Sequence, residues 1–163
     1  MRRYRYVGPQ EIREAAAGDA PGTLIRDARD LEPFATGEPL TYVVGVDGIL
    51  RVASRRSEHV ACAGSGEVLA AGEITAELAG KKRECRVVEV SNQSTGFCPA
   101  PESWDAIASA LDAAKIPRPD AFTFVAVFRR CPKCGERNLV KDGIFECALC
   151  GGELPAEWNF GGE

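Results

Sequence analysis

Four of the seven cysteines fall within a 22-residue stretch, and their spacing constrains this chain more than any other feature. They form two pairs with two residues inside each pair and twelve residues between the pairs: Cys131, Cys134, Cys147 and Cys150. Two residues between cysteines let one tight turn present both thiolates to a single ion. Gly135 and Gly151 directly follow the pairs, where a residue without a Cβ lets the backbone turn under the metal. The intervening "RNLVKDGIFE" predicts a strand, an Asp142-Gly143 turn and a second strand, which would return the second pair to the first.

Over residues 129–152 this pattern resembles the zinc ribbon family. The resemblance implies that Cys131, Cys134, Cys147 and Cys150 hold Zn²⁺. Iron also accepts four thiolates, and two disulfides or four unrelated thiols are the alternatives to a metal. An odd number of cysteines excludes complete internal disulfide pairing, so we expect a reducing compartment, by default the cytoplasm. Four protein ligands leave no open coordination position, so the site is expected to build structure and not to activate water.

Composition predicts an ordinary folded chain. Apolar residues make up 45% and charged residues 27% of the 163 positions, with a formal net charge of −4. The basic start "MRRYRYVGPQEIRE" has no apolar core of the kind that secretory signals carry. No apolar run approaches the roughly 20 residues that a membrane-spanning helix needs, so no membrane association is expected.

The patterning predicts an α+β fold that is mainly β, with a hairpin-rich body, two short helices and a C-terminal zinc ribbon. The helices are expected over residues 8–18 and 101–117, the second capped by Ser103. The clearest hairpin is "TYVVGVDGILRVA", where two β-branched runs flank Asp47-Gly48. Further strands are expected over 68–78, 84–92 and 121–128, whereas the proline- and glycine-rich residues 18–40 are expected to be mainly loop. We place the body at 1–125 and the ribbon with its aromatic tail at 126–163, packed together because no flexible linker separates them.

Residues 59–74, "HVACAGSGEVLAAGEI", and 91–99, "SNQSTGFCP", carry a second resemblance. They are similar to a module of plant IQ-motif calmodulin-binding proteins and of the C-terminal regions of some bacterial Rhs-type toxins. The matching positions are His59, Ala63-Gly64, Ala70-Ala71-Gly72 and Ser94 to Pro99. Where the module has Gly-His-Tyr, this chain has Thr95-Gly96-Phe97, so the aromatic residue is kept and the histidine is lost. The resemblance implies a β-rich unit in which His59 lies near the "SNQSTGF" loop.

His59, Glu73 and Cys98 are the catalytic candidates. A thiol enzyme needs a nucleophile within hydrogen-bond reach of a base, and His59 is the one histidine of the chain. The alternative is a hydrogen-bonded structural histidine and a small buried cysteine. A second metal site from His59, Cys62, Cys85 and Cys98 is a further alternative, with irregular spacings. A deaminase is not expected, because His59 is followed by Val60-Ala61 and not by x-Glu.

Three functions remain open at this level. The first is an adaptor-like interaction protein that docks a protein partner. The second is an enzyme that uses His59 with Cys98 or Glu73. The third is nucleic-acid binding through "RRYR" (2–5) and Arg129-Arg130, which is less favoured because residues 129–163 contain five basic and six acidic side chains. The tail residues Trp158 and Phe160 are expected to pack back onto the protein, with partner contact as the alternative.

Overall fold

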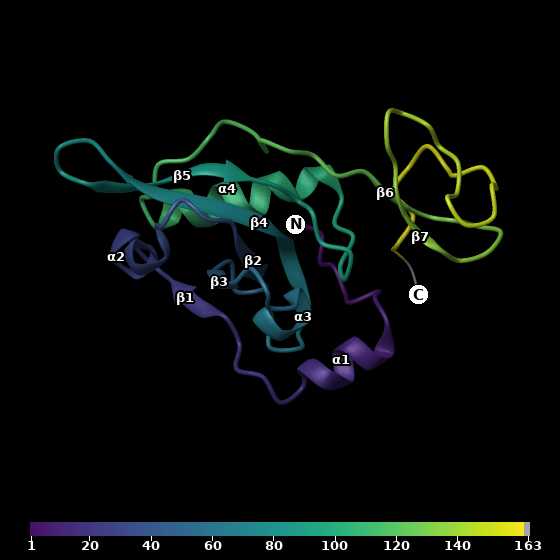
Figure 1. The fold of residues 1–163 in the computed structure, drawn as a ribbon, viewed down its shortest axis with the longest axis horizontal. Coiled ribbons are helices and arrows are strands. Elements are labelled where there is room, and N and C mark those ends of the chain that lie inside the picture. Colours follow the sequence, from purple (N-terminus) through teal and green to yellow (C-terminus); the bar gives the residue numbers. More distant parts are fainter. Residues whose placement is uncertain (162–163) are drawn as a thin grey trace.

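The computed structural model describes residues 1–161 and has the predicted class, α+β and mainly β (Figure 1). Its elements are α1 (Gln10–Ala16), β1 (Thr23–Ile25), α2 (Ala28–Leu31), η1 (Glu32–Phe34), β2 (Leu40–Gly45), β3 (Leu50–Ser54), α3 (His59–Cys62), β4 (Val68–Ala79), β5 (Glu84–Val90), η2 (Pro101–Ser103), α4 (Trp104–Ala113), β6 (Phe128–Arg130) and β7 (Arg137–Leu139). Strands β1 to β5 form one antiparallel sheet in the order β1-β3-β2-β4-β5, and β6 pairs with β7. Within residues 1–161, no helix combines the length and the apolar character required to cross a bilayer.

The predicted hairpin around Asp47-Gly48 is confirmed as β2 and β3. Gly48 has φ +81°, a conformation that costs little in the absence of a Cβ. An Asp47 carboxylate oxygen accepts the Ile49 N–H at 3.0 Å, and the same carboxylate pairs with Arg51. Both contacts anchor the turn to the start of β3.

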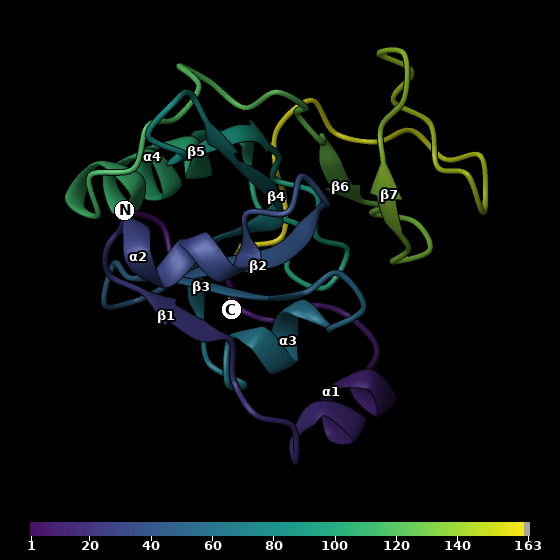
Figure 2. The same ribbon diagram turned by 60° about the vertical axis from the view of Figure 1, so that its left-hand side comes forward.

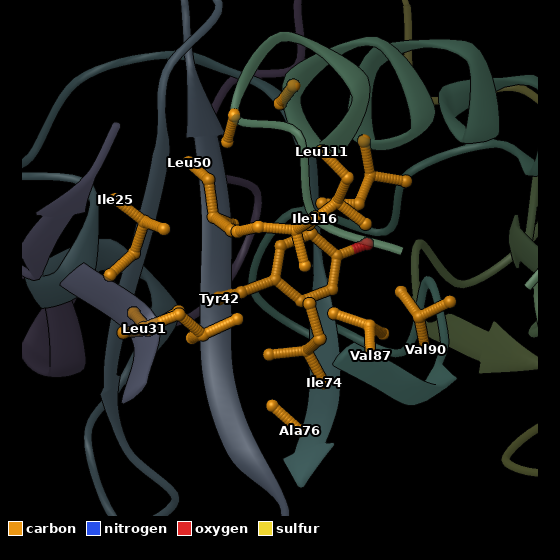
Figure 3. Packing of buried hydrophobic residues seen from close by; sticks show 14 of the residues in the cluster. Ile25, Leu31, Tyr42, Leu50, Ile74, Ala76, Val87, Val90, Leu111 and Ile116 are labelled. Carbon is orange, nitrogen blue, oxygen red and sulfur yellow. The ribbon is translucent and has the colours of Figure 1, made fainter. Parts of the chain in front are cut away.

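One face of the large sheet is buried under α4 (Figures 2 and 3). Tyr42, Ile74 and Leu111 are almost completely buried there. The Tyr42 hydroxyl donates a hydrogen bond to the Ser91 carbonyl at 2.8 Å, so the one polar atom of this ring is satisfied inside the core. This face supplies most of the apolar area that holds the body together.

The opposite face is only partly covered. The N-terminal segment, α1 and α3 pack against it around Val43 and Ala71. Farther along β4, Glu73 and Thr75 line open hollows instead. Strand β4 is therefore apolar on both faces at one end and polar on one face at the other, which explains why its sequence alternation is imperfect.

The β6–β7 unit joins the body through a small buried cluster that consists of Cys98, Ala126, Phe128 and Phe160. Trp158 packs at this cluster and makes an edge-to-face contact with Tyr4, with 5.5 Å between the ring centroids. The prediction that the aromatic tail packs back onto the protein is thus confirmed.

One local prediction was incomplete and two were wrong. Residues 18–40 lie mainly outside helices and strands, as predicted, but they also contain β1, which pairs with β3, as well as α2 and η1. Ser103 does not cap α4, because it already has helical φ and ψ in η2, and its hydroxyl has no partner among residues 1–161. The strand expected over 121–128 is reduced to a bridge between Ser91 and Phe124 and to Phe128 itself in β6.

Side chains explain the missing strand. The Thr123 hydroxyl accepts the Val90 N–H at 2.8 Å and donates to the Val90 carbonyl at 3.0 Å. Asn92 does the same for Ala126, accepting its N–H at 2.6 Å and donating to its carbonyl at 2.8 Å. Two polar side chains thus bond backbone groups that would pair with each other in a regular sheet. The hydrophobic periodicity of the sequence cannot reveal such side-chain bonds.

Candidate metal centre and the environment of His59

The two cysteine pairs are held by turns with the same hydrogen bonds. The Gly135 and Gly151 N–H groups donate to the carbonyls of Cys131 and Cys147, each at 2.9 Å. The N–H groups of Cys131 and Cys147 each donate back across the turn at 2.8 Å, to Glu136 and Gly152. Both glycines have positive φ, +81° and +75°, as their positions after the pairs predicted.

The four sulfur atoms converge on one point. All four Sγ atoms lie within 4.8 Å of one another, and the closest pairs, Cys131 with Cys150 and Cys134 with Cys147, are each 3.6 Å apart. A tetrahedral ion with metal–sulfur bonds of about 2.3 Å separates its sulfurs by about 3.8 Å. The cysteines are free thiols in this arrangement, so the geometry fits a shared ion and not two disulfides.

Hydrogen bonds to sulfur favour the thiolate form at two of the four positions. The Cys150 N–H is the main cause that lowers the pKa of Cys147 to about 6, and the Asn138 amide adds to it through an N–H to sulfur contact of 3.4 Å. The Cys134 N–H likewise lowers the pKa of Cys131. Negative sulfur held in this way is the donor that a soft or borderline divalent cation prefers.

Asn138 is a site residue that the sequence analysis missed. It is buried in β7, and its carbonyl oxygen accepts the Ala148 N–H at 2.9 Å while its amide N–H contacts Cys147. Asn138 therefore links β7 to the turn that carries Cys147 and Cys150. The sequence did carry a signal for this role, because Asn138 is a polar residue at an inward-facing position of the strand predicted between the two cysteine pairs.

Cys131 and Cys147 are buried beside Leu154, and Val140 and Phe145 pack against them. Cys134 and Cys150 lie on the exposed side. Among residues 1–161, these four cysteines are the one group of three or more ligand-type side chains at metal-binding distance. The alternative metal site from His59, Cys62, Cys85 and Cys98 therefore does not form.

His59 begins α3, and its Nε2 lies 2.8 Å from the Gly72 carbonyl oxygen. A carbonyl can only accept, so Nε2 carries the proton and Nδ1 keeps a free lone pair. Burial lowers the pKa of the imidazole, although the Gly72 contact opposes this shift. At neutral pH the ring is thus uncharged and has a fixed tautomer.

The structure brings His59 and Glu73 to the same polar hollow, which has a volume of about 250 Å³. The hollow is lined by Thr41, Arg55, Arg56, Ser57, Glu58, His59, Glu73, Gln93, Ser94 and Thr95. Part of the "SNQSTGF" loop therefore lies beside His59, as the second resemblance implied.

Cys98 does not belong to this hollow. Its thiol donates to the Thr95 carbonyl at 3.5 Å and is buried at the junction with the β6–β7 unit. Burial raises the pKa of Cys98 to about 12, and that of Cys62 likewise to about 12. His59 and Cys98 thus occupy separate environments.

Two of the arginines considered for nucleic-acid binding, Arg2 and Arg129, make contacts within the protein. Arg129 is buried, and its guanidinium donates to the carbonyls of Phe128, Pro155 and Ala156. Arg2 stacks over the Trp158 ring at 4.4 Å and lies 3.6 Å from Glu102. These groups fasten the chain ends to the protein.

Comparison of the chain with protein-family models, with curated proteins and with solved structures found no match. The class of the protein therefore follows from its own geometry: an α+β protein with a four-cysteine cluster at metal-binding distance.

Proposed function

We propose that the protein is a zinc-binding interaction protein of the cytoplasm. Cys131, Cys134, Cys147 and Cys150 hold one Zn²⁺ that shapes residues 126–163, and the unit so formed docks a protein partner. The observation that carries the proposal is the convergence of four sulfur atoms within 4.8 Å. A cytoplasmic location agrees with this chemistry, because the thiolates must stay reduced to bind the ion.

The zinc is structural in this proposal. Four cysteine ligands saturate a tetrahedral ion, so no position is left for water or substrate. The apolar cluster directly around the cysteines is small, consisting of Leu154 with Val140 and Phe145 beside it. A core of that size needs the free energy of metal binding to stay folded.

The exposed apolar side chains of the same unit support docking. Ile144 lies at the tip of the Lys141–Ile144 bridge and is 61% exposed, and Leu149 lies in the second cysteine turn and is 70% exposed. A hollow beside Leu149 is lined by Leu139 and Ala148 and by four polar residues, Glu136, Arg137, Asn138 and Lys141. Apolar side chains held rigidly at a surface are the kind of anchor that protein interfaces use.

Metal analysis of protein purified without added metal tests the first part. We expect one zinc per chain in the wild type and in Cys85→Ser, because Cys85 lies in the core under α4. Cys147→Ser should lose the ion. Iron in place of zinc would give visible sulfur-to-iron absorbance and would overturn the zinc assignment, and a metal-free wild type would overturn the site.

Crosslinking in the source cell tests the docking part. Leu149→Asp should remove the crosslinked partner while the zinc content stays at one per chain. The matched control is Val46→Asp, which changes an exposed residue in the β2–β3 turn, 49% exposed, and should keep the partner. Equal capture by both variants would contradict docking through this surface.

The other two functions have less support. Thiol chemistry at Cys98 is disfavoured by its burial and by its pKa of about 12. Nucleic-acid binding through Arg129 is disfavoured, because its guanidinium is already bonded to three carbonyls. Retention on DNA or RNA that falls steeply with salt would reopen that alternative.

A further inference from the structure

The hollow beside His59 has a volume of about 250 Å³ and lies in the body, outside the four-cysteine cluster. It lies where the sheet face next to Glu73 is left uncovered, and all ten residues that line it are polar or charged. A second hollow of about 130 Å³ shares Glu73 and Gln93 with it. Glu73 therefore stands at the meeting point of two open spaces on one face of the sheet.

The backbone N–H and carbonyl of Glu73 are both hydrogen-bonded to Ser91. The Glu73 N–H donates to the Ser91 hydroxyl at 3.2 Å, and the Ser91 N–H donates to the Glu73 carbonyl at 2.9 Å. Gly72 permits this approach, since a Cβ there would lie 2.0 Å from the Ser91 carbonyl oxygen. The Gly72 carbonyl in turn orients His59. The "AAGE" sequence thus positions both residues.

The loop that carries Gln93, Ser94 and Thr95 is equally constrained. Asn92 is fully buried, and it bonds the Pro99 and Ala126 carbonyls and the Ala126 N–H. The Cys98 N–H donates to the Ser94 carbonyl at 2.7 Å, with Cys98 itself at φ +45°. Groups presented from so rigid a loop lose little entropy when they bind a ligand.

The charged side chains around the hollow have no bonding partner within residues 1–161. Within residues 1–161, the carboxylates of Glu58 and Glu73 and the guanidinium groups of Arg55 and Arg56 form no ion pair and accept or donate no side-chain hydrogen bond. This contrasts with Arg51, Arg86 and Arg118, each of which pairs with an acid. The hollow offers two cations together with acceptors that have no donor.

These groups define the ligand by complementarity. Two guanidinium groups call for an anion, and guanidinium matches phosphate well. The Glu73 carboxylate and the His59 Nδ1 lone pair can only accept, so they call for hydroxyl donors on the ligand. An apolar ligand would leave every one of these polar groups without a hydrogen-bond partner.

We propose that this hollow binds a phosphorylated sugar, with Arg55 and Arg56 on the phosphate and with Glu73 and His59 on sugar hydroxyls. The site is distinct from the proposed zinc site and from the docking surface, because none of its lining residues belongs to 126–163. One contact joins the two regions, since Arg137 of β7 donates a hydrogen bond to the Thr95 carbonyl.

The NMR signal of the single histidine reports ligand binding at this site. In the zinc-loaded full chain, titration with ribose 5-phosphate should shift the one imidazole Hε1 resonance and give a saturable curve. Ribose alone and inorganic phosphate alone should each bind at least about tenfold more weakly, because each lacks one half of the contacts. Phosphate that binds as tightly as ribose 5-phosphate would overturn the sugar contacts, and no shift at millimolar ribose 5-phosphate would overturn the site.

Substitutions test the sugar contacts and the phosphate contacts of the site separately. Glu73→Gln keeps the shape of the side chain and should weaken ribose 5-phosphate at least about tenfold without weakening phosphate binding, because it removes a negative charge from the hollow. Glu84→Gln, at an exposed position of β5, is its control. The double variant Arg55→Gln/Arg56→Gln should weaken both phosphate and ribose 5-phosphate, whereas Arg26→Gln/Arg29→Gln, exposed near α2, should weaken neither. Wild-type affinity in Glu73→Gln, with its amide spectrum unchanged, would contradict the proposal.

Discussion

The indole Nε1 of Trp158 donates a hydrogen bond to the carbonyl oxygen of Cys98 at 2.7 Å, across 60 residues of sequence. This bond ties the C-terminal tail to the loop after β5. Cys98 also packs with Phe160 and Phe128, so the same place joins the β6–β7 unit to the body. The cysteine that looked like a nucleophile is part of this junction.

Trp158→Phe tests the junction. The phenyl ring can keep the apolar contact with Tyr4, but the Cys98 carbonyl loses its donor. We expect the free energy of unfolding to fall by about 1–2 kcal/mol, measured by urea denaturation. The matched control is Trp104→Phe, because the Trp104 indole N–H has no acceptor among residues 1–161. Equal losses in both variants would show that the hydrogen bond does not matter.

The sequence revealed features that local chemistry determines. The Asp47-Gly48 turn and the glycines after each cysteine pair need positive φ or an Asx contact, and such needs are visible in the residues themselves. The convergence of the four cysteines followed from spacing for the same reason. The nearness of His59 to the "SNQSTGF" loop was expected from a resemblance and not from periodicity, whereas Glu73 was a candidate by residue type alone.

Tertiary bonding decided the features that the sequence analysis missed. Short β1 exists because Thr23 and Ile25 pair with β3, which no local preference in a proline-rich segment indicates. The strand lost at 121–128 depends on Asn92 and Thr123, which bond backbone groups more than 30 residues away in sequence. Cys98 and His59 were paired by residue type, but apolar neighbours from the chain end bury the thiol elsewhere.

Removal of the proposed zinc ion should unfold the segment around the four cysteines and leave the β1–β5 sheet folded. After chelation we expect amide hydrogen exchange to accelerate across residues 131–154, because little apolar surface holds that unit once the ion is gone. Amides of β2 and β4 should stay protected, since Val43 and Val44 lie in cores that the metal does not touch. Loss of protection in β2 and β4 at the same chelator concentration would mean that the two parts fold as one.

Asn92→Ala should be among the most destabilising substitutions in the chain. It removes bonds to the Pro99 and Ala126 carbonyls and to the Ala126 N–H, and all three groups are left without a partner. We expect a loss of about 3 kcal/mol or more in the free energy of unfolding. Gln10→Ala on α1 removes a single exposed contact with Glu14 and serves as the control, with a loss below about 0.5 kcal/mol. A loss in Asn92→Ala no larger than in that control would contradict the network.

His59 should titrate below its ordinary pKa of 6.5, because burial disfavours the imidazolium. The single Hε1 resonance makes the midpoint directly measurable by NMR. The unfolded chain then binds the proton at a higher pH than the folded chain does, so stability is complete above pH 6.5 and declines as pH falls from there to the folded pKa. With zinc kept saturating, His59→Gln should flatten the stability profile in that window. A midpoint at or above 6.5 would contradict the assigned environment.

Gly72→Ala tests how the hollow beside His59 is built. A Cβ at this position would lie 2.0 Å from the Ser91 carbonyl oxygen and 3.1 Å from the Asn92 Cα, so β4 and the loop after β5 must separate. We expect a loss of about 2–3 kcal/mol in the free energy of unfolding. The His59 Hε1 resonance should move as well, since the Gly72 carbonyl holds the imidazole. Gly18→Ala is the matched control, because nothing lies within 4 Å of a Cβ there, and it should change neither quantity appreciably. A Gly72→Ala protein of wild-type stability with an unmoved histidine resonance would show that the close approach of Gly72 to Ser91 does not position this site.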